Sequence, residues 1–389
     1  MTLSIHPSVQ NLEDEIVATR RDIHKHPELS FKEFRTAKLV SERLQSLGIE
    51  VREQVGKTGV VGTLCGGKEG PTVALRADMD ALPMQETSDV PYASIHEGVM
   101  HACGHDGHTA MLLGAAKVLS DKREQIAGNV KFIFQPAEEG YAGAKYMVAD
   151  GALEGVDEIY GIHLWNYQKF GTVGVKPGPI MAASDKFTID IQGIGGHGAC
   201  PQGTVDPIVV AAHLITALQT IVSRNTNPLE STVVTVGMME GGTNFNIIPH
   251  HATLKGTARA YTEDNRNLIK KRMAEITAGV GATYGAKITL DYQDGYPPTI
   301  NADEQAQVLL EAAQKIVGDT EAGYPYLSMG GEDFSYFAQE VPACYFLVGS
   351  APLDREPMSV PHHCSHFDID ERALLVGASV FVQVIEDRL

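Results

Sequence analysis

Nine residues concentrate the metal-binding chemistry of this chain: Met100-His101-Ala102-Cys103-Gly104-His105-Asp106-Gly107-His108. Cys103 and His105 are two positions apart, so in an extended segment both side chains point to the same side and can share one metal centre. Thiolate and imidazole suit Zn, Ni, Co or Mn better than Ca or Mg, which prefer oxygen ligands. The stretch predicts a transition-metal site if distant partners complete it; otherwise Cys103 is an inert buried side chain.

The segments on either side of this stretch have an α/β pattern. Residues 108–120 carry apolar side chains at helical spacing, which places the stretch at a helix N-terminus, where the helix dipole favours anionic groups. Residues 72–76 are typical of a strand, and Asp78 and Asp80 follow it. Carboxylates at the carboxyl end of a strand lie where α/β proteins usually keep their sites.

Two further apolar strands precede polar residues. Residues 128–134 are followed by Pro136 and the adjacent carboxylates Glu138 and Glu139, and residues 158–162 are followed by His163. Adjacent residues of an extended loop face opposite ways, so one Glu can bind metal while the other takes a proton from water. The alternative is a solvated surface pair.

The N-terminal region and the middle of the chain have other patterns. Residues 12–25 have helical spacing, and Ser30 with Glu33 predicts a capping box for a helix that runs to Leu47. Residues 186–294 read as strand, helix, strand, strand, helix, strand, a small open sheet with helices on one face. The glycines at 193–198 lack the spacing of a dinucleotide-binding loop.

Composition limits the classes of function. A length of 389 residues predicts two domains, and a net charge of -18 argues against a nucleic-acid partner. No apolar run approaches the length of a membrane span, and residues 1–10 lack the features of a signal peptide. Five scattered cysteines, an odd number, favour a reducing compartment, and we therefore expect a cytoplasmic protein.

Ordered motifs along nearly the whole chain resemble the M20 metallopeptidase group. The similar branch is that of amidohydrolases, which includes hippurate hydrolases, N-acyl-amino-acid amidohydrolases and plant auxin-conjugate hydrolases. The motifs lie at residues 21–28, 75–83, 100–108, 135–139, 196–197, 242–249, 256–259 and 329–334. The resemblance implies an α/β catalytic domain (1–185 and 295–389) with a mixed central sheet flanked by helices. It also implies an inserted α+β lid and dimerisation domain (186–294).

The resemblance further implies a centre of two divalent ions (Zn, Mn, Ni or Co), with Glu138 as the general base and the Cys103 sulfur bridging the ions. The implied ligands are Cys103, His105, Glu139, His163 and His363. His363 is preferred to His362 because it lies four residues before Phe367, although Ser365 stands where relatives often have Pro. Where other M20 members have a His two residues before an Asp, this chain has Asp78 and Asp80. Asp80 would orient a ligand imidazole, and Asp78 is a weaker candidate.

The resemblance also implies two roles outside the donor set. His197 of the lid would serve the oxyanion, reaching a site across a dimer, and the lid residues Asn246 and Arg259 would bind the substrate together with Gly330 of the catalytic domain. Taken alone, the first three read as a turn histidine, a turn asparagine and a surface ion-pair partner. The expected protein is a homodimer or homotetramer, formed through the lid, that hydrolyses the amide bond of N-acyl amino acids.

Three alternatives remain open at this point. A dipeptidase or carboxypeptidase would use the same centre. A non-catalytic metal-binding protein would lack a ligand or the base, whereas all six positions are occupied. A redox role for Cys103 would need another cysteine brought close in space.

Overall fold

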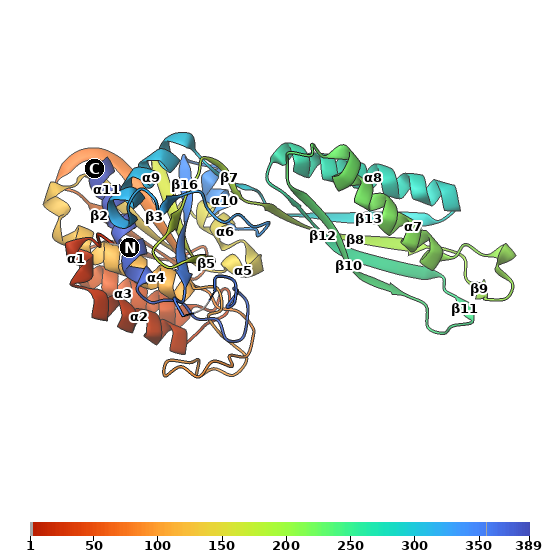
Figure 1. Ribbon diagram of the computed structural model, residues 1–389, viewed down its shortest axis with the longest axis horizontal. Coiled ribbons are helices and arrows are strands. Elements are labelled where there is room, and N and C mark those ends of the chain that lie inside the picture. Colours follow the sequence, from red (N-terminus) through yellow and green to blue (C-terminus); the bar gives the residue numbers. More distant parts are fainter. Residues whose placement is uncertain (1–2, 355) are drawn as a thin grey trace. The chain divides into compact units, whose positions relative to one another are not determined.

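The computed structural model describes residues 3–354 and 356–389 and divides into two compact units (Figure 1). The larger unit comprises Met1–Ile180, Ile300–Leu327 and Asp333–Leu389, and the smaller unit comprises Met181–Thr299 and Ser328–Glu332. Met1 and Thr2, the start of the N-terminal segment considered above, lie outside the described residues. The smaller unit is therefore an insertion in the larger one.

The larger unit is built on an eight-stranded mixed sheet in its described residues, which confirms the α/β fold class. Its order is β1-β2-β4-β3-β5-β16-β6-β15, with parallel pairing of β4, β3, β5 and β16 and antiparallel pairing of β1, β2 and β4. The strands are β1 (Glu50–Val55), β2 (Gly59–Cys65), β3 (Lys68–Asp78), β4 (Ala127–Gln135), β5 (Glu158–Lys169), β6 (Val173–Gly174), β15 (Ala322–Gly323) and β16 (Ala343–Ala351). A separate pair joins β7 (Gly178–Met181) to β14 (Thr299–Asn301).

Helices cover this sheet (Figure 1). All nine residues of β16 are buried, as expected for an apolar strand enclosed on both faces. Helix α4 is also almost wholly buried and contacts α2 and α11. The helices are α1 (Pro7–Gln10), α2 (Glu13–Lys25), α3 (Phe34–Ser46), α4 (His105–Asp121), η1 (Arg123–Gln125), α5 (Glu138–Tyr141), α6 (Gly143–Ala149), α9 (Asp303–Val317), α10 (Ser335–Ala338) and α11 (Ala373–Arg388).

Helices α4 and α11 approach closely at one glycine. A Cβ atom added to Gly377 of α11 would lie 2.2 Å from the Met111 sulfur of α4. Because this separation is far below van der Waals contact, the absence of a side chain at Gly377 permits the packing. The helix that carries His105 is thus held against the C-terminal helix.

The smaller unit has a four-stranded antiparallel sheet in the order β10-β12-β8-β13, with two helices packed on it (Figure 1). This is the sheet and helix order expected for residues 186–294. Its elements are β8 (Ala183–Gln192), β9 (Gly196–His197), η2 (Pro201–Gly203), α7 (Pro207–Thr220), η3 (Ile221–Asn225), β10 (Thr232–Gly241), β11 (Ile247–Ile248), β12 (His251–Ala260), α8 (Glu263–Tyr284) and β13 (Lys287–Tyr296).

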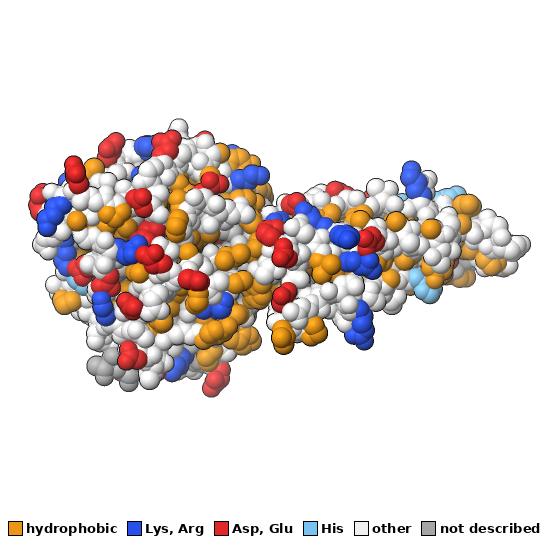
Figure 2. Space-filling model, turned by 90° about the horizontal axis from the view of Figure 1, so that it is seen from above, with side chains coloured by type: hydrophobic (Ala, Val, Ile, Leu, Met, Phe, Trp, Pro, Cys, Tyr) orange, Lys and Arg blue, Asp and Glu red, His pale blue; other side chains and the backbone are white. Residues whose placement is uncertain are grey.

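One helical segment of the smaller unit, Pro207–Asn225, is long and apolar enough to cross a membrane by length and composition alone. Its side chains Val210, Leu214 and Leu218 are buried in the core of the smaller unit, and α7 contacts β12 and α8. Packing on the sheet therefore accounts for these three apolar side chains, which are part of the segment. On the face shown in Figure 2, acidic and basic side chains are interspersed.

The capping box predicted at Ser30 and Glu33 is wrong. Helix α3 begins at Phe34, and its backbone N–H groups at Arg35 and Thr36 donate to the Glu28 carboxylate at 2.9 and 2.8 Å. Ser30 instead donates its hydroxyl to Asp80 at 2.7 Å. The segment before α3 therefore contributes polar side chains to the interior rather than a local cap.

Two local expectations about the site segments also need correction. Cys103 and His105 do not lie in one extended segment, because Gly104 has φ 95° and α4 begins at His105. His163 does not follow a strand that ends at residue 162, because β5 continues to Lys169. His163 is therefore held inside the central sheet.

Candidate metal centre

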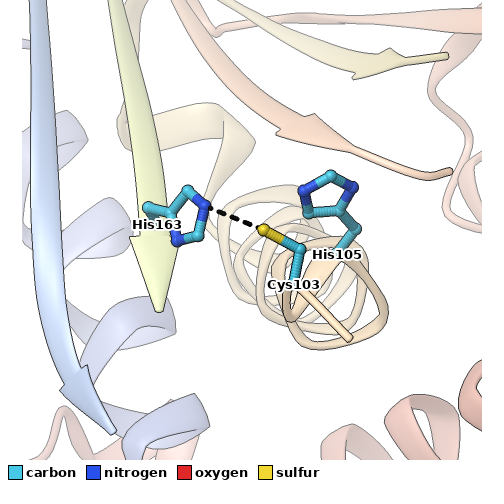
Figure 3. A group of neighbouring side chains, drawn as sticks. All are labelled: Cys103, His105 and His163. Atoms are coloured by element: carbon cyan, nitrogen blue, oxygen red, sulfur yellow. Dashed lines mark hydrogen bonds between the residues drawn. The ribbon is translucent and has the colours of Figure 1, made fainter. Parts of the chain in front are cut away.

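Three side chains meet where α4 begins beside β5. The Cys103 sulfur points toward the His163 ring from just before α4, and its distance to His163 Nε2 is 3.5 Å (Figure 3). Ligand atoms of Cys103, His105 and His163 all lie within 4.8 Å of one another. The turn at Gly104 thus brings a thiol and two imidazoles, from two distant segments, to one point.

A second group of ligand atoms shares the same sulfur. Atoms of Cys103, Glu139 and His363 also lie within 4.8 Å of one another, and His363 Nε2 is 3.2 Å from Glu139 Oε1. A third group joins His105 to Glu138 and Glu139. Because Cys103 belongs to two donor sets, the arrangement can hold two ions with the sulfur between them.

The two buried imidazoles are oriented by backbone carbonyls. His105 Nδ1 lies 2.9 Å from the Asp80 carbonyl oxygen, and His163 Nδ1 lies 2.5 Å from that of Leu164. In each case Nδ1–H donates, so that Nε2 is the nitrogen left to bind a cation. His105 Nε2 is buried without a hydrogen-bond partner in the described chain, which fits a metal ligand.

Burial and charge shift the protonation of this group. Burial lowers the pKa of His105, but the carboxylates of Asp78 and Asp80 outweigh that effect and raise it to about 10. Burial, together with the nearby charges of Glu139 and Glu138, raises the pKa of the Cys103 thiol. Cation binding must therefore displace protons from these donors.

The Asp80 carboxylate is hydrogen-bonded to the backbone of Glu138 and Glu139. Its Oδ1 accepts the Glu138 N–H at 3.0 Å, and its Oδ2 accepts the Glu139 N–H at 3.1 Å. Its Oδ1 also lies 3.3 Å from His105 Nδ1. Burial raises the pKa of Asp80, but hydrogen bonds from His105 and Ser30 overcome this effect and lower it. An ionised Asp80 thus fixes both glutamates and one imidazole.

Asp78 has hydrogen-bond and ion-pair partners different from those of Asp80. Its two oxygens lie 2.6 Å from His108 Nδ1 and 2.7 Å from Arg76 Nη1, and all three side chains are buried. His108 Nε2 accepts the Leu164 N–H at 2.8 Å, so Nδ1–H donates to Asp78. Although Asp78, His105 and His108 also form a group with metal-binding atoms, these bonds already occupy Asp78 and His108. Asp78 and His108 therefore support the site through their hydrogen bonds and do not supply donor atoms.

Sequence reasoning missed two buried charged residues near the site. Arg76 bonds Gln135 and Asp333 in addition to Asp78, and Arg20 bonds Asp106, Asp368 and Glu371. The sequence offered one signal for the first, since Arg76 interrupts an otherwise apolar strand. The sequence offered no such signal for Arg20, because an arginine in an amphipathic helix commonly lies on the protein surface.

The two adjacent histidines near the C-terminus have different surroundings. His362 is half-buried and packs against the rings of Trp165, Tyr167 and Phe367, and its Nε2 accepts the Asn166 N–H at 3.2 Å. His363 has φ 61° and a half-exposed side chain, and it is the one grouped with Cys103 and Glu139. The structure thus brings His363, and not His362, to the donor set.

The expected residues of the smaller unit lie at two ends of its sheet. His197 and Asn246 are exposed beside the β9 and β11 pair, where the Gly198 N–H donates to the Asn246 carbonyl. Arg259 is near the other end of β12, opposite Ser184, and donates to the Asp185 carbonyl at 3.4 Å. Gly330 accepts the Ala182 N–H near Arg259. His197 and Arg259 therefore do not meet within one copy of this unit.

Comparisons with known proteins match this chain over both units. A family model described as peptidase family M20/M25/M40 matches residues 74–387. The N-acetyl-L-cysteine deacetylase of Bacillus subtilis is 41% identical over 384 residues, covering 98% of this chain and 90% of that protein. Thermostable carboxypeptidase 2 of Saccharolobus solfataricus is 44% identical over 376 residues, covering 95% and 94%.

A solved structure is also similar. It is the crystal structure of the Bacillus subtilis YXEP protein, described as a dinuclear metal-binding peptidase from the M20 family. Its TM-score is 0.85 and its sequence identity 35%, covering 97% of this chain and 98% of that chain. The match therefore extends over the whole region that contributes donor atoms.

Proposed function

Because the chain belongs to peptidase family M20/M25/M40 and is a metal-dependent hydrolase of amide bonds, we propose that its substrates are N-acyl amino acids. The products would be a carboxylate and a free amino acid. The observation that carries the proposal is the Cys103 sulfur shared by two donor sets, with Glu138 beside the ligand Glu139. The relative named as a deacetylase acts on an N-acetyl amino acid, which supports the substrate class.

In this proposal Cys103, His105, Glu139, His163 and His363 hold two divalent ions, which supply Lewis acidity when bound. Glu138 accepts a proton from the attacking water and delivers it to the amine nitrogen as the C–N bond breaks. Asp80 fixes the direction of both glutamates through their N–H groups. Sulfur and imidazole donors suit Zn, Ni or Co, and the carboxylate donor Glu139 also suits Mn.

We assign the larger unit to catalysis and the smaller unit to a lid and dimerisation role. His197 and Arg259 are separated by nearly the full length of β12, roughly 27 Å at about 3.4 Å per residue. If His197 stabilises the oxyanion and Asn246, Arg259 and Gly330 bind substrate at one site, then the sheet end with His197 and Asn246 must come from a second copy. A homodimer or homotetramer formed through the smaller unit meets that requirement. We place the protein in the cytoplasm.

The test is hydrolysis of benzoylglycine, several N-acetyl amino acids and matching dipeptides. Protein stripped with a chelator is reloaded separately with Mn, Co, Ni or Zn. We expect cleavage of the acylated substrates and its loss in Glu138→Gln, because an amide cannot take the proton. Turnover that survives Glu138→Gln would contradict the mechanism.

A carboxypeptidase function is the second candidate, favoured by the similarity to thermostable carboxypeptidase 2. The acyl part of the substrate distinguishes the two candidates, because it is a simple acid in an N-acetyl amino acid and an amino acid in a dipeptide. Comparison of kcat/KM for an N-acetyl amino acid and for a free dipeptide with the same C-terminal residue decides between them. Preference for the free dipeptide would replace the N-acyl amino acid proposal.

A further inference from the structure

Three consecutive backbone N–H groups beside the site bond to two buried carboxylates. Asp80 accepts those of Glu138 and Glu139, as described above. The preceding N–H, that of Ala137, donates to Glu33 Oε1 at 2.9 Å. Glu33 and Asp80 are 0% and 1% exposed. The turn that presents both glutamates is thus held by two buried carboxyl groups rather than by a regular helix.

The backbone of this turn needs such support. Ala137 has φ 55° and ψ 45°, in the left-handed region that residues other than glycine rarely adopt. Glu139 and Gly140 also depart from helical angles. Conformations of this kind persist only when surrounding contacts enforce them. The bond from Ala137 to Glu33 is one such contact, immediately before Glu138.

Glu33 is itself fixed in place. Its Oε1 also accepts the Phe31 N–H at 2.9 Å, and its other oxygen accepts the Thr58 hydroxyl. The neighbouring Ser30 donates to Asp80, so one short segment before α3 connects to both carboxylates. The carboxylate of Glu33 is therefore a rigid acceptor, supplied by a part of the chain far from residue 137 in sequence.

We propose that Glu33 is a positioning residue, which holds Ala137 in its left-handed conformation and so sets the direction of Glu138 and Glu139. The proposal deepens the function proposed above and rests on it for the roles of these two glutamates. It predicts that Glu33 acts on cation binding through Glu139 and on turnover through Glu138, with little effect on substrate affinity.

The experiment compares Glu33→Ala with Glu33→Gln, which keeps a carbonyl acceptor for the Ala137 N–H. Glu28→Ala is the matched control, because Glu28 is a carboxylate of the same segment that bonds α3 and not the turn. Three readouts are used: Zn affinity of the stripped protein by competition with a chromogenic chelator, hydrogen exchange of the peptide covering residues 133–140, and kcat and KM.

For Glu33→Ala we expect Zn affinity to fall about 10- to 100-fold, as is typical when a supporting partner of a ligand is removed. We also expect faster exchange in residues 133–140 and a fall in kcat with KM nearly unchanged. Glu33→Gln should stay within about threefold of the wild type, and Glu28→Ala should lower thermal stability without changing Zn affinity.

The proposal is overturned if Glu33→Ala binds Zn like the wild type, or if Glu28→Ala loses as much affinity. If Glu33→Ala does not fold, Glu33→Asp takes its place, because the shorter side chain withdraws the carboxyl group from Ala137 while keeping the same kind of group. Affinity and exchange are measured without substrate. If the wild type does not cleave N-acyl amino acids, the function proposed above is refuted. The role of Glu33 is still tested in that case, by Zn affinity and hydrogen exchange.

Discussion

At the residue scale, Cys103 is the donor shared by the group that contains His163 and the group that contains His363. Removing His163 leaves the group of Cys103, Glu139 and His363 intact, whereas removing Cys103 depletes both groups. The motif in the sequence indicated a metal site. By itself it did not indicate this sharing, which only the resemblance to the M20 group implied, because His163, Glu139 and His363 come from distant segments whose meeting depends on the folded sheet.

We therefore expect Cys103→Ser to bind neither ion tightly and His163→Ala to retain one. The loss of affinity in Cys103→Ser should exceed the roughly 10- to 100-fold that follows removal of an outer partner. Metal content per chain, measured by atomic emission after gel filtration, checks this expectation. Two ions retained by Cys103→Ser would show that the sulfur is not a shared ligand.

A second prediction at the residue scale concerns how the protonation of Glu33 affects the stability of the fold. Burial is the main cause that raises the pKa of Glu33, to about 7 from 4.5, and the nearby charge of Asp80 adds to it. The folded state then holds a proton that the unfolded state has lost, so this contribution to stability is present below pH 4.5 and is lost as pH rises through 7.

Glu33→Gln removes this titration and should gain stability relative to the wild type as pH increases. At 1.36 kcal/mol per pKa unit, the gain between pH 5 and pH 8 is up to about 3 kcal/mol. Urea unfolding of both proteins at the two pH values, after treatment with a chelator so that ion loss does not contribute, measures it. An equal difference in unfolding free energy at pH 5 and pH 8 would refute the assignment.

At the scale of elements, long periodic segments were predictable and short or polar ones were not. Helices α2 and α4 and strand β4 follow from apolar spacing over seven or more residues. Strands β6 and β15 have two residues each and carry no periodicity. The capping box failed because Ser30 and Glu33 form hydrogen bonds to residues distant in sequence, which a local motif does not reveal.

Two helical glycines give a matched prediction at this scale. Gly377→Ala places a methyl group against Met111, and overpacking of this kind costs about 1–3 kcal/mol. Gly279→Ala, on the exposed side of α8, meets nothing within 4 Å and should stabilise by about 0.5–1 kcal/mol, since Ala favours helix. Urea unfolding of each variant gives both values. A neutral Gly377→Ala would mean that α4 and α11 separate easily.

At the scale of the whole molecule, the M20 family and its amidohydrolase branch were predictable because the motifs span nearly the full chain. The division into an inserted sheet unit and a larger discontinuous unit is visible in the structure. The sequence alone does not place His197 and Arg259 at opposite ends of one sheet. If both residues act at one site, as proposed, they must come from two copies of the chain.

Mixing two inactive variants tests that requirement. In a dimer of His197→Ala with Arg259→Ala, one site loses both side chains and the other keeps both. After random exchange half of the dimers are mixed, so activity should return to about a quarter of the wild type. The rate is measured before and after exchange, with each variant alone as the control. No recovery, with exchange verified by mass spectrometry, would mean that His197 acts within its own chain.

The pairing of β5 with β16 has a consequence for synthesis. Strand β5 is an interior strand of the sheet, yet its partner β16 begins about 170 residues after β5 ends, beyond the inserted unit. At roughly 5–20 residues per second, the ribosome leaves one apolar edge of β5 open for about 9–35 seconds. During that interval the nascent chain presents an unpaired strand to its surroundings. Its yield in cells should therefore depend on chaperones that shield such edges until the C-terminal segment emerges.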